Sequence, residues 1–175
     1  MMRAKRSVRL LVSVMILALL PLAQSMPIAI VISTGSGGWT VSATGKPTVA
    51  GNNFSTTTYT SATNQTVLRV NRNPGGWMTG GKGWIVYVHK NDTATWNGNL
   101  QLWIRRTNNP APGLSGGPGL NVYTQLTSTD QEFFRCTSQT QVTNIRCQLE
   151  IRGASANVLV QPSDVTSVVY TVTEY

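Results

Sequence analysis

Apolar and polar residues alternate in several short runs of this chain, and this pattern most constrains its fold. In "NIRCQLEI", Ile145, Cys147, Leu149 and Ile151 alternate with polar or charged residues. Alternation with a period of two places the apolar set on one face of a half-buried β-strand. Beyond the N-terminal segment, no window shows the 3.6-residue apolar period of an amphipathic helix. The chain is therefore expected to be all-β.

Segments with this strand character recur along the chain, and turns rich in glycine, proline or asparagine separate them. The segments are 27–33, 39–44, 52–60, 65–71, 83–90, 99–106, 121–127, 131–136, 142–152, 156–161 and 167–175. Because no helix is available for parallel crossovers, the strands should pair antiparallel. We expect a single antiparallel two-sheet β-sandwich of about ten strands over 39–175, with a closed barrel as the alternative.

The first 25 residues have the organisation of a secretory signal peptide. Four basic residues among the first nine precede an uncharged apolar run at 10–22, and "AQS" supplies the small residues of a cleavage site. We therefore expect a secreted, extracellular protein with no membrane anchor after removal of 1–25. The alternative is an uncleaved anchor, because "PIAIVI" extends the apolar stretch towards the ~20 residues that a bilayer needs.

The chain has two cysteines, Cys136 and Cys147. A pair of cysteines in an exported chain favours one disulfide. Cys147 lies on the apolar face of its strand, so we expect the bond to join two antiparallel neighbours across the polar loop 137–144. No metal site is expected, because one histidine and two cysteines supply too few ligands.

Charge and motifs argue against several functions. Beyond the signal, ten basic residues face six acidic ones without clustering, which disfavours a nucleic-acid partner. Gly76 to Lys82 reads G-x-x-x-x-G-K, but Gly83 and a strand follow in place of Ser or Thr and a helix, so no nucleotide cofactor is expected. His89 ends a strand, and no two acids share an apolar setting. The protein is therefore expected not to be an enzyme.

Tryptophans offer the better functional lead. Trp77 lies in the glycine-rich turn, and Trp103 shares the outward face of its strand with Arg105. Both are candidate surface contacts, because an outward aromatic on a sheet is either a contact surface or a lid over a neighbouring strand. A secreted binding module for glycans or a host surface is therefore one functional hypothesis.

The segment that follows the expected cleavage site is apolar on both faces. Ile28, Ile30 and Ile32 share one face, and Val31 lies on the other. A strand that leaves nothing polar outside must be covered on both sides. The flexible linker "STGSGG" (33–38) follows, so 26–38 form a candidate donor strand with its tether. The alternative is that the strand pairs within its own domain.

The export signal, the apolar N-terminal strand and the alternating terminal strand "VVYTVTEY" together resemble a class of prokaryotic surface-fibre subunits. These subunits are immunoglobulin-like, pilin-like sandwiches that often join by lending a strand to a neighbour. The likeness is architectural and covers 26–175, and it departs from chaperone-assembled pilins in the late position of the cysteines. The resemblance implies a structural subunit of an extracellular filament, pilus or surface coat that self-associates into a homopolymer.

Overall fold

The computed structural model describes residues 28–35, 38–41, 58–71, 83–137, 141–155 and 164–175, and these residues form ten strands and no helix. The expected signal peptide, Trp77 and the glycine-rich turn up to Lys82 lie outside them. The strands are β1 (Ala29–Thr34), β2 (Tyr59–Thr60), β3 (Thr66–Asn71), β4 (Trp84–Asp92), β5 (Gln101–Arg106), β6 (Leu114–Ser115), β7 (Thr124–Gln125), β8 (Gln131–Cys136), β9 (Val142–Arg152) and β10 (Thr166–Glu174). Within the described segments, no helix exists that could span a membrane.

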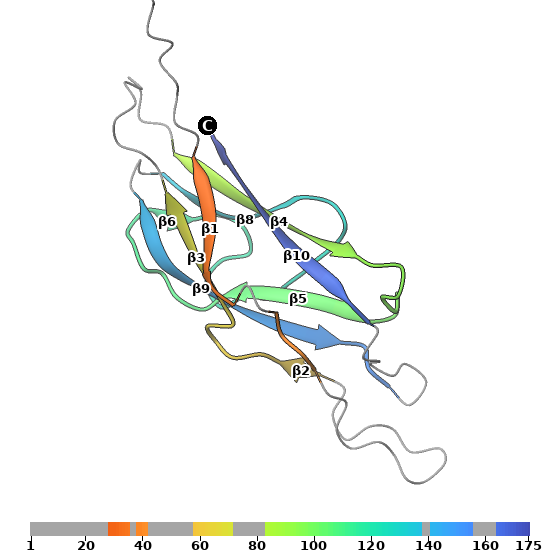
Figure 1. Ribbon diagram of the computed structural model, residues 1–175. Coiled ribbons are helices and arrows are strands. Elements are labelled where there is room, and N and C mark those ends of the chain that lie inside the picture. Colours follow the sequence, from red (N-terminus) through yellow and green to blue (C-terminus); the bar gives the residue numbers. More distant parts are fainter. Residues whose placement is uncertain (1–27, 36–37, 42–57, 72–82, 138–140, 156–163) are drawn as a thin grey trace, which may run out of the picture.

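The strands form two antiparallel sheets (Figure 1). Sheet A has the order β1-β3-β9-β5-β7, and β2 also pairs with β9. Sheet B has the order β10-β4-β8-β6. The arrangement fits a β-sandwich and confirms the expected all-β, antiparallel, two-sheet fold. Consecutive strands such as β8 and β9 lie in different sheets, so several loops cross from one sheet to the other.

The alternating apolar residues meet between the sheets, as the sequence pattern requires. Leu68, Ile104 and Ile145 of sheet A are fully buried, as are Trp84 and Phe134 of sheet B. The Trp84 and Phe134 rings meet edge to face, with centroids 6.0 Å apart. Fully burying one such side chain contributes roughly 1.5–3 kcal/mol, so the inner faces of the two sheets dominate the stability of the fold.

Alternation breaks in β8, where consecutive residues Phe133 and Phe134 are both buried. The register between β4 and β8 shifts between Val86 and Tyr87, which is a β-bulge. The extra residue of the bulge turns Phe133 inward, and its ring lies 5.2 Å from that of Phe134. The bulge thus adds a second large aromatic side chain to the core.

The predicted disulfide was wrong: Cys136 and Cys147 are both buried and form no disulfide. Cys136 ends β8 in sheet B and pairs with Trp84, whereas Cys147 lies in β9 of sheet A and pairs with Thr66. The prediction treated β8 and β9 as neighbours across a hairpin loop, but the loop connects the two sheets. The inward orientation expected for Cys147 is confirmed by its burial.

An arginine also lies in this core. Arg106, at the end of β5, is only 3% exposed, and its Nε and Nη1 atoms have no hydrogen-bond partner among the described residues. Its guanidinium lies 5.4 Å from the centre of the Phe134 ring. Burial lowers the pKa of Arg106 below its ordinary value, and nearby Cys147 opposes this shift.

Candidate strand-binding groove

The two long edge strands of the molecule lie on the same side. β1 is the edge of sheet A, and β10 is the edge of sheet B. They contact each other across the gap between the sheets, and the opposite edges are the two-residue strands β7 and β6. β10 pairs with β4 along its whole length and with no other strand among the described residues. Its outer edge therefore offers unpaired backbone groups.

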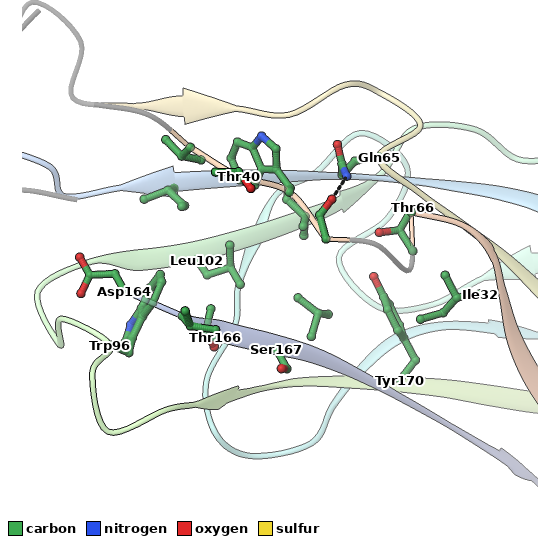
Figure 2. A pocket seen from close by; sticks show the side chains of 18 residues that line it. Ile32, Thr40, Gln65, Thr66, Trp96, Leu102, Asp164, Thr166, Ser167 and Tyr170 are labelled. Atoms are coloured by element: carbon green, nitrogen blue, oxygen red, sulfur yellow. Dashed lines mark hydrogen bonds between the residues drawn. The ribbon is translucent and has the colours of Figure 1, made fainter. Parts of the chain in front are cut away.

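A groove with a volume of about 490 Å³ opens between these edges (Figure 2). Its floor is apolar and comes from the inner face of sheet A, where Leu102, Leu149 and Ile151 line it. β10 supplies one wall through Val168 and Tyr170. Burial raises the pKa of Tyr170 well above its ordinary value, so its hydroxyl stays neutral. The groove is thus suited to apolar side chains and uncharged polar groups.

One end of the groove is more polar. Trp96 lines it beside Asp164, whose carboxylate accepts a hydrogen bond of 3.1 Å from the backbone N–H of Asn97. Lys90 Nζ lies 5.4 Å from the centre of the Trp96 ring, a cation–π distance. The indole Nε1 of Trp96 is buried and has no hydrogen-bond partner in the described part of the chain. This end therefore holds a buried donor whose hydrogen-bonding capacity is unused.

The chain itself fills part of the groove. After β1 it turns at Gly35, and the N–H of Gly38 donates to the Gly35 carbonyl at 3.3 Å. Gln65 Nε2 donates to the Gly38 carbonyl at 3.1 Å, which fixes the returning segment beside β3. Trp39 and Val41 then pack, partly buried, against the core and line the groove. Trp39 thus contacts the core as expected, although 39–41 form no strand.

The predicted donor strand pairs with its own domain in the single chain. β1 pairs antiparallel with β3, from Ala29 opposite Asn71 to Ile32 opposite Leu68. Ile28 and Ile30 pack partly buried against the core. Val31 is 42% exposed and Ile32 39% exposed. One chain alone therefore does not cover both faces of this apolar strand.

The other predicted contact residue, Trp103, lies on the outer face of sheet A and is half-buried. Its ring lies under the guanidinium of Arg152, at 4.1 Å from guanidinium carbon to ring centre, and its Nε1 donates to Gln101 Oε1 at 3.2 Å. A sugar ring stacking on this tryptophan would have to displace Arg152. A bare stacking platform is therefore not present at Trp103.

The single histidine of the chain lies beside a carboxylate. His89 Nδ1 lies 2.6 Å from Asp130 Oδ1, and this pair sits on the outside of sheet B. Among the residues that the model places, no three His, Cys, Asp or Glu side chains gather to hold a metal ion.

Comparison of the chain with models of known protein families, with curated proteins and with solved structures found no match. The geometry of the molecule therefore carries the functional argument. The sequence pointed to Trp77 and Trp103, but Trp39 and Trp96 line the groove. Trp96 lies in the loop before β5, where no periodic pattern assigns it a direction, so only the fold could place it there.

Proposed function

We propose that the protein is a structural subunit of an extracellular filament, pilus or surface coat, and that it assembles by exchanging its N-terminal strand, residues 27–33. The observation that carries this proposal is the pair of long edges, β1 and β10, which face each other across an apolar groove. In the single chain β1 pairs only with β3. A strand donated by a neighbour lies between β3 and β10 and pairs with both.

Two contributions favour assembly by strand exchange over the single chain. A strand with partners on both edges forms additional main-chain hydrogen bonds, each contributing about 0.5–1.5 kcal/mol net. Ile32, which lines the groove, loses remaining exposure, which adds on the order of 1 kcal/mol, a fraction of the value for full burial. The linker from Ser33 to Gly38 provides the reach. Because each subunit gives a strand and accepts one, the contact is heterologous and extends into a filament.

Exchange of an identical element lowers the cost of assembly. The donated β1 occupies the place that the acceptor's own β1 leaves, so most of the contacts with β3 are kept. The acceptor's own segment 38–41 follows its β1 out of the groove. Only the opening of one edge strand must then occur before a second copy binds.

A pair of cysteines tests this proposal directly. Val31 and Arg69 are opposite each other in the β1–β3 pair, where Cα atoms lie about 4.5–5.5 Å apart, within the range for a disulfide. The double variant Val31→Cys/Arg69→Cys is oxidised after assembly and separated under denaturing, non-reducing conditions. Donation predicts a ladder of covalently linked subunits that reducing agent collapses.

Oxidation before assembly provides the second arm. In this double variant, an intramolecular disulfide between positions 31 and 69 holds β1 against its own β3. The monomer should therefore not polymerise until the disulfide is reduced. Single variants at each position serve as controls for unspecific crosslinking. If concentrated protein yields only internally bonded monomers, and electron microscopy shows no filaments, β1 belongs to its own domain and the proposal fails.

A further inference from the structure

The outer face of sheet A carries most of the positive charge of the described residues. Register and alternation place Arg69 of β3, Arg105 of β5 and both Arg146 and Arg152 of β9 on this face. Glu150 is the only carboxylate in any strand of sheet A. The other five acids of the chain lie in sheet B or directly before its strands. Among the described residues this face is therefore basic, and apart from Glu150 the acids lie elsewhere.

Two of these arginines are stacked on aromatic rings. The guanidinium of Arg152 lies 4.1 Å from the centre of the Trp103 ring and 5.4 Å from that of Tyr123. The guanidinium of Arg105 lies 4.6 Å from the centre of the same Tyr123 ring. Two cations thus share one aromatic side chain, which holds them close together despite their mutual repulsion.

Hydrogen bonds fix both stacked guanidiniums through their Nε atoms. Arg105 Nε donates to Gln148 Oε1 at 2.9 Å, and Gln148 is itself anchored by its Nε2, which donates to the Ser61 carbonyl at 2.6 Å. Arg152 Nε donates to Glu150, whose other oxygen accepts a hydrogen bond from Thr60 Oγ1. Both hydrogen bonds use Nε, and the Nη groups make no hydrogen bond with the described residues. Arg152 remains 37% exposed in its side chain.

Oriented guanidinium forks suit carboxylate and sulfate groups, which accept two parallel hydrogen bonds. Arg146 and Arg152 lie six residues apart on β9, which separates them by about 20 Å along an extended strand. We propose that this face, comprising Arg69, Arg105, Arg146 and Arg152, binds an acidic polysaccharide that carries carboxylate or sulfate groups along its length. The ligand lies across the strands of sheet A, away from the groove.

The same geometry disfavours the other large polyanions. Single-stranded nucleic acids bind by stacking bases on aromatic rings, but guanidiniums already cover Trp103 and Tyr123. Among the described residues, sheet A carries no helix on this face that could enter the major groove of a duplex. Acid-bearing sugars require only spaced hydrogen-bond donors and positive charge, and this face provides both.

Binding of the full chain to alginate, a polyuronate, and to dextran sulfate tests the proposal, with neutral dextran as the reference. Tryptophan fluorescence and calorimetry report binding at low and at physiological ionic strength. We expect binding of both acidic polymers, none of dextran, and weakening as salt is added. The exposed residues Arg69 and Arg146 can change without disturbing the stack, so Arg69→Gln/Arg146→Gln should weaken binding roughly tenfold.

Arg135→Gln is the matched control, because it removes one positive charge from sheet B, where Arg135 binds Glu132. It should leave alginate binding within about twofold of the wild type, as expected for a remote exposed charge. Arg105→Lys keeps the charge but loses the planar fork, and should weaken binding of both polymers.

Three results would overturn the proposal. The first is no binding of either acidic polymer at low ionic strength. The second is an equal loss in Arg135→Gln and in the double variant, which would show unspecific attraction. The third is preferential binding of poly(U) RNA or of phosphatidylserine vesicles in competition with alginate, which would assign the face to another class of partner.

Discussion

Replacing Gly35 with alanine should loosen the N-terminal strand more than any other single change in its tether. Gly35 has a φ of +88°, and a Cβ at this position would meet the backbone oxygen of Gln65 at 1.8 Å. Gly38 is the matched control, since its φ is +87° but a Cβ there would meet no atom within 4 Å. Both variants share the backbone strain, and only Gly35→Ala adds the steric clash.

The magnitude follows from these two terms. Placing an L-residue at positive φ costs about 1–2 kcal/mol. Replacing glycine by alanine also lowers the conformational entropy of the unfolded chain, which offsets about 0.4–1 kcal/mol of this cost. Gly38→Ala should therefore cost about 1 kcal/mol or less. In Gly35→Ala the clash with backbone adds roughly 1–3 kcal/mol, as for overpacked sites. The loss is limited by what docked β1 contributes, because a strand that no longer fits detaches.

Denaturant unfolding and limited proteolysis measure this difference. Gly35→Ala should show faster cleavage within β1 than Gly38→Ala, while cleavage of the remaining strands stays slow. If strand exchange builds the filament, Gly35→Ala should also assemble faster, because its β1 detaches from its own β3 more readily. Equal stability and equal cleavage of the two variants, within about 0.5 kcal/mol, would refute the close approach of Gly35 to Gln65.

Three further predictions concern the thiols, acid stability and the isolated acceptor. Cys136 and Cys147 are both fully buried, so both should resist a thiol reagent in the native state and react after unfolding. For Cys147, burial also raises the pKa above its ordinary value. Fewer than two titratable thiols after unfolding would contradict the absence of a disulfide. Hydrogen bonding to Arg135 lowers the pKa of Glu132. The stability that this pair contributes is therefore present above the unfolded-state pKa of Glu132 and is lost as pH falls through the folded-state pKa. Glu132→Gln should then destabilise the protein at neutral pH but not at about pH 3, and a difference in urea midpoint between variant and wild type that stays constant with pH would argue against the pair. A chain that begins at Gly35 should fail to polymerise, and added peptide PIAIVIS should raise its melting temperature; a peptide without effect would count against an open strand site.

The alternating runs predicted the long strands well, because period-two burial is a local property of each segment. Residues 142–152 were predicted as a strand, and β9 has the same bounds. The two-residue strand β6 lies in a glycine- and proline-rich stretch, where pairing with β8 rather than local propensity decides the structure. Its pattern gives no signal in the sequence.

The sites were less accessible to prediction than the strands. Alternation showed that Cys147 points inward, but it could not show that β8 and β9 belong to different sheets, so it could not exclude a pair of cysteines across a hairpin. It placed Trp103 outward, but not Arg152 over its ring, because that contact depends on the pairing of β5 with β9. Such relations come from the sheet order, which local patterns do not encode.

The short strands β6 and β7 limit the number of sheet edges at which another copy can pair. A sheet edge recruits other strands in proportion to its unpaired backbone groups, and edges of two residues offer very few. Among the described strands, only the side that carries β1 and β10 presents long edges. If copies join by strand exchange, growth is restricted to one dimension, and the two ends of the resulting line differ: one has a free strand and the other an open site. Such an assembly has a direction, so addition of subunits can be started, stopped or capped at one end alone.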